Sequence, residues 1–264
     1  MDPRLKLIRS RDNPQVKALI KLAGSSRERR HTGTTIIEGE HLVRAYQQAG
    51  QTAETIFVSE SSYAKPQIRS LVETAPASAR LLLADGLVEQ LSQLVSAAGV
   101  AAVVRTPRAA PLPQGTASCL LLENIQDPGN LGSILRSAVA AGVSNVLLSR
   151  GSVFAWSPKV VRAGMGAHFA LSICEEVELR AYADTFAGRI VAMEPRAKRS
   201  LYDIDLSGPI AWIFGNEGGG ITEDLRKTAT DSVRIPMPGP AESLNVAAAA
   251  AICLFEQVRQ QHGA

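Results

Sequence analysis

Residues 1–106 alternate between short apolar runs and segments whose apolar residues recur with the period of a helix. Asn13-Pro14 is typical of a helix start, because asparagine caps helices and proline suits the first helical position, and Gly24 marks the expected end. Further helical patterns occupy Glu40–Ala49, Lys65–Glu73 and Gly86–Val95. Strand-like runs occupy Thr34–Ile37, Thr55–Ser59, Arg80–Leu83 and Ala101–Arg105. This alternation predicts a compact α/β domain with helices packed on a sheet.

A proline-rich stretch then interrupts the pattern. Three prolines fall within residues 106–115, where neither a helix nor a central strand could continue. We therefore predict a linker over residues 107–116, between a first domain over 1–106 and a second domain over 117–264.

The second domain repeats the α/β alternation with more strongly apolar strands. Strands are predicted at Ser118–Glu123, Asn145–Ser149, Phe169–Ile173, Arg189–Met193, Pro209–Phe214 and Val233–Pro236. Helices are predicted at Leu131–Ala141, Pro158–Ala163, Leu179–Phe186, near Thr222–Lys227, and from Ser243 to about Gln260. Apolar strands bracketed by helices predict a mainly parallel, buried sheet.

Composition places the chain among ordinary globular enzymes, with 45% hydrophobic and 20% charged residues. No apolar run approaches the roughly 18 residues of a membrane helix, and the N-terminus lacks the apolar run of a secretory signal. The cytoplasm is therefore the expected location. Cys119, Cys174 and Cys253 lie far apart in apolar runs, which predicts buried thiols rather than zinc ligands.

Charge is distributed unevenly along the chain. The first 30 residues hold nine Lys or Arg and three acidic residues, a net charge of +6, whereas the whole chain carries +3. A basic arm of this kind favours a polyanionic partner, because cations that contact phosphates release condensed counterions. A solvated, charged helix face is the alternative for these residues taken alone.

Three loops that follow predicted strands carry candidate chemistry, and the first spans residues 123–132. Its residues Gly129 and Gly132 permit a tight turn or a close approach to a ligand. Asn130 is predicted to cap the following helix. Arg136 is the only charged side chain of that helix, and it is either functional or simply exposed to solvent.

The second loop, residues 213–221, leads from a hydrophobic strand into four glycines separated by Asn216 and Glu217. Such strand ends let a backbone approach a nucleotide, although they also form simple turns. The loop is neither a GxGxxG motif nor a P-loop, which disfavours hydride transfer and NTP hydrolysis. The third loop, residues 235–246, is rich in proline and glycine. Ser243 is the expected cap of the last helix, and Asn245 falls in its first turn.

Together the three loops resemble the motifs of the SpoU-type (TrmH-like) 2′-O-ribose methyltransferases of the SPOUT superfamily. The matching residues are Asn124, Asp127–Gly132 and Arg136; Phe214–Gly218; and Ile235–Met237 with Ser243–Val246. Their order and spacing also match, over roughly residues 118–260. Residues 3–105 resemble the family's ribosomal-protein-like substrate-binding domain through Ser10–Pro14, Lys17 and Ile37–Gly39.

This resemblance implies a C-terminal α/β domain with a trefoil knot and a mainly parallel sheet, plus a smaller N-terminal α/β domain that binds RNA. It implies S-adenosylmethionine as the cofactor, held mainly by backbone groups, and no metal. The implied cofactor-binding residues are Gly215, Asn216, Gly218, Ile235, Met237, Leu244 and Asn245. The implied reaction is methyl transfer to a ribose 2′-hydroxyl of RNA.

The implied catalytic residues are Arg136, Asn130, Glu217, Ser243 and Asn245. Because arginine stays protonated, we expect Arg136 to stabilise the developing alkoxide, with a role as general base as the alternative. Glu217 is expected to hold Arg136 in a charge-assisted pair.

The resemblance also implies a homodimer, with the final helix at the interface. The predicted RNA-binding residues are Arg11, Asn13, Lys17, Arg29, Arg30 and Arg162. The additional N-terminal domain favours 23S ribosomal RNA over transfer RNA as the substrate.

Two positions depart from the family pattern. Gly164 stands where serine is usual, which removes a polar side chain near the predicted RNA contact Arg162, and Gly219 replaces a polar residue. A transfer RNA methyltransferase and a non-catalytic RNA-binding relative are the alternative functions. The non-catalytic reading predicts losses among the proposed catalytic residues, yet all of them are present. A Rossmann-type enzyme would need an acidic residue at the end of its second strand, and Leu147–Arg150 offers none.

Overall fold

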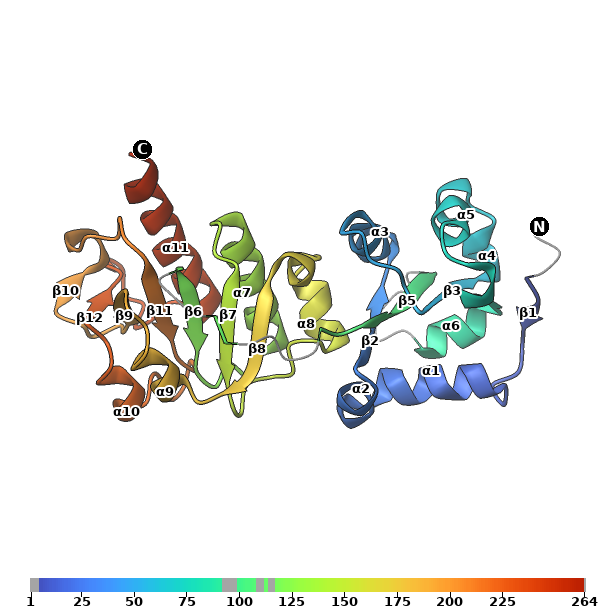
Figure 1. The fold of residues 1–264 in the computed structure, drawn as a ribbon, viewed down its shortest axis with the longest axis horizontal. Helices are drawn as coiled ribbons and strands as arrows, with labels where there is room; N and C mark the ends of the chain where they lie inside the picture. The colour runs from blue at the N-terminus through green and yellow to red at the C-terminus, as the bar shows by residue number, and fades with distance from the viewer. Residues whose placement is uncertain (1–4, 92–98, 108–111, 114–116, 264) are drawn as a thin grey trace. The chain divides into compact units, whose positions relative to one another are not determined.

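Contacts within the chain divide it into two units (Figure 1). The computed structural model describes residues 5–91, 99–107, 112–113 and 117–263. One unit comprises Met1–Arg108 with Trp156–Phe169, and the other comprises Ala109–Ala155 with Ala170–Ala264. Most of the predicted linker and the end of the predicted helix Gly86–Val95 lie outside the described residues. The domain bounds inferred from the sequence therefore stay a prediction.

The first unit contains a mixed sheet with helices packed on it, which confirms the predicted α/β class. The described strands follow the order β1-β4-β3-β5-β2. Strand β4 is parallel to its neighbours β1 and β3, whereas β5 is antiparallel to its neighbours β3 and β2. The strands are β1 (Leu7–Ile8), β2 (Thr34–Glu38), β3 (Thr55–Ser59), β4 (Arg80–Leu83) and β5 (Val100–Arg105). The helices are α1 (Pro14–Gly24), α2 (Ser26–Thr32), α3 (Glu40–Gln48), α4 (Glu60–Tyr63), α5 (Pro66–Glu73), α6 (Asp85–Leu91) and α8 (Pro158–Ala163).

Helix α1 begins and ends where the sequence predicts. The Asn13 side chain accepts a hydrogen bond from the Gln15 amide at 2.9 Å, and Pro14 occupies the first helical position. The apolar face of the helix is buried through Val16, Leu19, Leu22 and Ala23. Helix α2 follows directly. Its sequence consists of polar and charged residues, so no periodic apolar pattern predicts this helix.

The second unit contains a sheet in which every described strand pair is parallel, as predicted. Its order is β10-β12-β9-β11-β6-β7-β8. The strands are β6 (Cys119–Leu122), β7 (Asn145–Ser149), β8 (Ser172–Val177), β9 (Arg189–Met193), β10 (Arg199–Ser200), β11 (Ile210–Phe214) and β12 (Asp231–Arg234). The helices are α7 (Pro128–Ala140), α9 (Leu179–Ala183), α10 (Glu223–Arg226) and α11 (Val246–His262).

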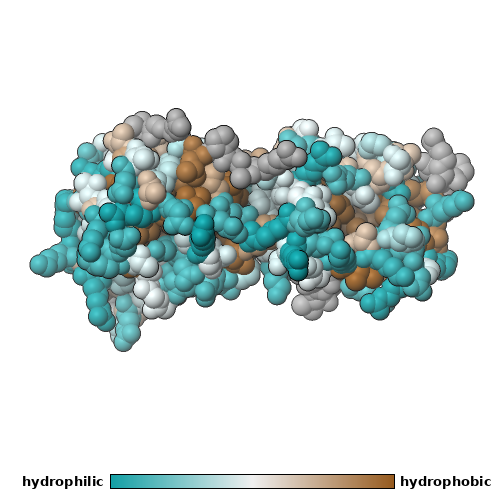
Figure 2. Space-filling model, turned by 60° about the horizontal axis from the view of Figure 1, so that its bottom comes forward, coloured by the Kyte–Doolittle hydropathy of each residue, from teal (hydrophilic) through white to brown (hydrophobic). Residues whose placement is uncertain are grey.

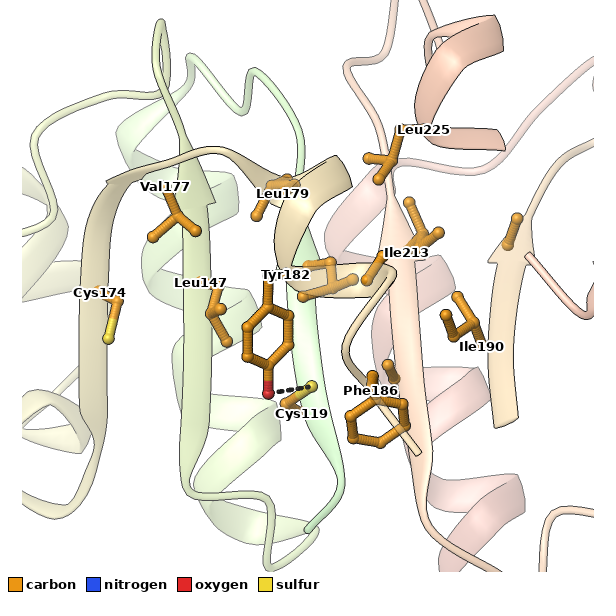
Figure 3. Close-up of a cluster of buried hydrophobic side chains, with 14 residues drawn as sticks. Cys119, Leu147, Cys174, Val177, Leu179, Tyr182, Phe186, Ile190, Ile213 and Leu225 are labelled. Atoms are coloured by element: carbon orange, nitrogen blue, oxygen red, sulfur yellow. Dashed lines mark hydrogen bonds between the residues drawn. The ribbon is translucent and has the colours of Figure 1, made fainter. Parts of the chain in front are cut away.

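The two faces of this sheet are covered by different helices (Figure 1). Helices α7 and α11 pack against each other, and the Trp212 indole of β11 donates a 2.8 Å hydrogen bond to Gln257 of α11. The opposite face packs on α9 and α10 through a cluster of buried side chains that includes Tyr182 and Leu225 (Figure 3). The sheet is therefore covered on both faces, as its apolar strands require.

The thiols lie in these cores, which confirms the predicted buried cysteines. In Figure 3 the Tyr182 hydroxyl points toward the Cys119 sulfur, 3.9 Å away. Burial raises the pKa of the Cys119 thiol to about 11, and burial also raises the pKa of Cys253. These thiols are therefore protonated and unreactive at neutral pH.

The surface seen in Figure 2 is mostly hydrophilic, with hydrophobic residues gathered in separate patches. Large exposed hydrophobic side chains in the described regions include Val139 of α7 and Phe255 of α11. None of the described helices is long and apolar enough to cross a membrane.

Candidate active site

The three candidate loops follow strands that lie close together in one parallel sheet. Strand β11 pairs with β6 so that Phe214 lies opposite Leu122, and β9 lies between β11 and β12. Parallel strands end at the same edge of a sheet, and ligands of open α/β sheets bind at the carboxyl ends of the strands. The loops after β6, β11 and β12 are therefore brought to one edge.

The glycine-rich loop after β11 is folded tightly on itself. A Cβ atom at Gly215 would lie 2.2 Å from the Gly220 carbonyl oxygen, so only glycine allows this approach. The side-chain oxygen of Asn216 accepts hydrogen bonds from the Gly218 and Gly219 amides at 2.8 and 3.2 Å. The Asn216 amide group donates to the Asn124 carbonyl at 3.0 Å. Asn216 thus closes the loop and ties it to the end of β6.

A row of hydrogen bonds connects the three loops. The Asn245 oxygen Oδ1 caps α11 by accepting from the Ala247 and Ala248 amides at 3.0 and 3.3 Å. This leaves Asn245 Nδ2 to donate to Asn130 Oδ1 at 2.8 Å, and Asn130 Nδ2 donates in turn to the Glu217 carboxylate. The helix amides fix the direction of the whole row, because they can only donate. Three predicted catalytic residues from three separate loops therefore meet in one ordered network.

Two predicted helix caps are wrong. Asp127 rather than Asn130 caps α7, since its carboxylate accepts from the Asn130 backbone amide at 2.8 Å. Asn245 rather than Ser243 caps α11. In the first case the Asn130 side chain is left free of the capping role, and it joins Asn245 to Glu217 instead.

The predicted pair between Arg136 and Glu217 is also absent. Arg136 is exposed on α7, and among the described residues it makes neither a hydrogen bond nor an ion pair. The Glu217 carboxylate accepts from Asn130 instead. The Arg136 guanidinium is thus left without a partner within the described chain, which suits a group that meets a substrate.

A cavity of about 550 Å³ lies against the glycine-rich loop, within the range of about 300–1,000 Å³ usual for small-molecule sites. Four of the predicted cofactor residues line it: Gly215, Asn216, Gly218 and Leu244. The catalytic candidates Glu217 and Ser243 line it too. The described lining does not include Ile235, Met237 or Asn245, so the predictions for these three as cofactor contacts rest on the motif alone.

Sequence reasoning missed one wall of this cavity. The turn after β9 contributes Met193, Glu194, Pro195 and Arg196 to the lining. No motif marks this turn, but the parallel order of the sheet could have indicated it. Strand β9 is the neighbour of β11, so the turn that follows it must reach the same edge.

The residues predicted to bind RNA have different environments in the first unit. Arg11, Arg30 and Arg162 are exposed, Lys17 forms an exposed ion pair with Asp12 at 2.8 Å, and the Asn13 side chain caps α1. Gly164, near Arg162, could not carry a side chain without movement, because a Cβ would lie 2.9 Å from the ring of the buried His168.

Arg29 requires a correction. It is only 6% exposed, and its Nη1 donates to the Leu22 and Ala23 carbonyls at 2.7 and 2.8 Å. These carbonyls belong to the last turn of α1, where helical partners are missing. Burial lowers the pKa of the Arg29 guanidinium. Arg29 therefore holds α2 against α1 and does not face an RNA phosphate.

Comparison with known proteins identifies the class to which this fold and site belong. The model of the SpoU rRNA Methylase family matches residues 117–255, and that of the MRM3-like substrate binding domain matches residues 13–102. The first match covers more than half of the chain. The chain belongs to the SpoU rRNA methylase family.

Particular relatives match over nearly the full length. The chain is 32% identical to the 23S rRNA (guanosine(2553)-2′-O)-methyltransferase RlmP of Bacillus subtilis, covering 95% of this chain and 98% of the relative. It is similar to an S-adenosylmethionine-bound rRNA methyltransferase from Sinorhizobium meliloti, with 28% identity, a TM-score of 0.83, and coverage of 97% and 98%. It is also similar to the SpoU methyltransferase AviRb of Streptomyces viridochromogenes, solved with S-adenosylmethionine, with 25% identity, a TM-score of 0.83, and coverage of 96% and 100%.

Proposed function

We propose that this chain transfers a methyl group from S-adenosylmethionine to a ribose 2′-hydroxyl of 23S ribosomal RNA. The observation that carries the proposal is the hydrogen-bonded row Asn245–Asn130–Glu217, which joins three family motifs beside the cavity. Family membership and the full-length similarity to a 23S rRNA 2′-O-methyltransferase support it. A transfer RNA substrate is the alternative.

The cavity suits the proposed cofactor. Its volume is that of a small-molecule site, and its glycines expose backbone groups to a ligand. We propose that Gly215, Asn216, Gly218 and Leu244 bind S-adenosylmethionine there, together with Ile235, Met237 and Asn245 from the motifs. When bound, the cofactor supplies a methyl group on a positively charged sulfur.

The protein's own contribution to the chemistry is electrostatic and positional. A ribose hydroxyl is a poor nucleophile at neutral pH, so the charge that develops on its oxygen needs stabilisation. We propose that Arg136 supplies this stabilisation. Asn130, Asn245, Glu217 and Ser243 then orient the target ribose, with Glu217 held in place by the hydrogen bond from Asn130.

The RNA is proposed to contact the N-terminal domain, residues 1–106, which matches a substrate-binding family. Arg11, Asn13, Lys17 and Arg30 of this domain stay proposed contacts, as does Arg162 of α8, whereas the buried Arg29 does not. Exposed cations of this kind position RNA through its phosphates. We also propose that the reaction takes place in the cytoplasm.

We further propose a homodimer and a trefoil knot in the C-terminal domain, residues 117–264. Phe255 of α11 and Val139 of α7 are 48% and 37% exposed, on two helices that pack against each other. Large exposed apolar side chains on adjoining helices suit burial against a second copy of the chain.

The test is methyl transfer from labelled S-adenosylmethionine to total RNA from a strain that lacks this protein. Fractionation by size would assign the label, and label in 23S RNA is the expected result. Label confined to transfer RNA would support the alternative substrate. Absence of label from naked RNA and from isolated ribosomal subunits alike would contradict the proposed activity.

A further inference from the structure

One residue at the end of β6 contacts both ends of the glycine-rich loop. The loop leaves β11 after Phe214 and reaches α10 at Thr222, the residue that caps that helix. The backbone amide of Glu123 donates to the Phe214 carbonyl at 2.9 Å. The Glu123 carboxylate accepts from both the backbone amide and the hydroxyl of Thr222, each at 2.7 Å.

The next residue adds a third attachment. Asn124 has a left-handed backbone, with φ of 54°, and its carbonyl accepts the hydrogen bond from Asn216 inside the loop. A left-handed conformation costs free energy for any residue except glycine, although asparagine tolerates it better than most. Its presence here directs the carbonyl of Asn124 to the loop.

The attached loop is the part of the chain that needs such support. It contains four glycines, the residues that lose the most conformational entropy on being ordered. Residues 215–221 all line the cavity described above. If binding had to order this segment, the entropic cost would reduce the affinity, whereas a loop that is already ordered avoids that cost.

We propose that Glu123 and Thr222 are positioning residues that set the affinity for the cofactor by holding the glycine-rich loop in its binding conformation. We call this pair the loop clasp. The proposal rests on the cofactor site proposed above. Neither residue needs to touch the cofactor, and neither belongs to the lining of the cavity.

The clasp makes a specific prediction for cofactor binding. Glu123→Ala removes both bonds to Thr222, whereas Thr222→Val keeps the bond from the backbone amide and removes the hydroxyl bond together with the Thr222 cap of α10. We expect the dissociation constant of S-adenosylmethionine, measured by calorimetry, to rise about tenfold for Glu123→Ala and less for Thr222→Val. Thr222→Ser and Glu123→Gln, which keep hydrogen-bonding groups, should restore most of the affinity.

Hydrogen exchange supplies a second measurement that needs no cofactor. In the free protein, backbone amides of residues 215–221 should exchange faster in Glu123→Ala than in the wild type, while those of β11 should not change. Asp224→Ala is the matched control. Asp224 is the second residue of α10, close to Thr222 in sequence, but its carboxylate pairs with Arg180 of α9 at 2.6 Å and takes no part in the clasp. It should leave both affinity and loop exchange unchanged.

The possible outcomes separate the clasp from the cofactor site. Wild-type affinity and wild-type loop exchange in Glu123→Ala would overturn the clasp, as would an equal effect of Asp224→Ala. A wild-type protein that binds no S-adenosylmethionine would overturn the proposed cofactor site instead. In that case, hydrogen exchange of the loop that is unchanged in Glu123→Ala would also contradict the proposed role of the clasp.

Discussion

Asn245 has two roles that a single substitution can separate. Its Oδ1 caps α11, and its Nδ2 donates to Asn130 at 2.8 Å. Asn245→Asp keeps the cap, because a carboxylate at a helix N-terminus accepts the same two amide hydrogen bonds. It replaces the donor by an acceptor that faces Asn130 Oδ1, however, so the row loses a hydrogen bond.

Rotation of the Asn130 amide cannot repair this row. If Asn130 turned its amide group toward Asp at position 245, its oxygen would face the Glu217 carboxylate, and two acceptors would again meet without a proton. One lost hydrogen bond costs about 1 kcal/mol, and the repulsion between acceptors adds an amount of similar order. The total of about 2 kcal/mol corresponds to a rate reduced about 30-fold.

The assay compares stability and rate in the same variants. In urea unfolding, Asn245→Asp should lose only the roughly 2 kcal/mol of the broken row, because its cap is kept. Asn245→Ala should lose about 1 kcal/mol from the cap and about 1 kcal/mol from the hydrogen bond to Asn130. Methyl-transfer rates under single-turnover conditions should fall in both. An Asn245→Asp protein that is folded and reacts within about threefold of the wild-type rate would refute the ordered row.

Three further predictions follow from single side chains. Arg136→Ala should abolish methyl transfer while S-adenosylmethionine still binds with near wild-type affinity in calorimetry, because the guanidinium has no bond within the described chain. Arg29→Met should lower the free energy of unfolding by roughly 2 kcal/mol and leave the salt dependence of RNA binding unchanged, whereas Arg30→Ala should lower the salt slope by about one. The hydrogen bond from Arg259 lowers the pKa of Glu256, so the stability that this carboxylate contributes is present above its unfolded pKa and lost as the pH falls through its folded pKa. Glu256→Gln should therefore lose less stability than the wild type as the pH falls from about 5 to below the ordinary glutamate pKa of 4.5 in urea titrations.

Much of the fold could be predicted because local signals agree with the packing. Asn13-Pro14 marks the start of α1, and the apolar runs of β3, β4 and β7 coincide with the observed strands. Strand β8 was predicted at Phe169–Ile173, but the structure has it at Ser172–Val177. This strand lies at the edge of its sheet and includes acidic residues, so the most apolar run was the wrong guide.

The helix caps show where a local signal was present but misread. Both Asp127 and Asn130 can cap a helix, and Pro128 between them decides the choice, because proline favours the first helical position. The residue before Pro128 is therefore the cap. Helix α2 gave no periodic signal at all, since it is held by the buried Arg29 rather than by an apolar face.

The candidate site could be predicted only as far as its motifs extend. Resemblance brought Asn130, Glu217 and Asn245 together before any geometry was known, and they lie in one network. The turn Met193–Arg196 and the clasp residue Thr222 belong to no motif. Their positions follow from strand order and from the path of a loop, which depend on contacts distant in sequence.

The central claim is that the methyl group is transferred to the ribose rather than to a base. The most direct test is to digest the labelled RNA to nucleosides and to identify the labelled product by chromatography and mass spectrometry. The expected product is a single 2′-O-methylated nucleoside, absent when the Arg136→Ala variant replaces the wild-type enzyme. Label on a methylated base would contradict it.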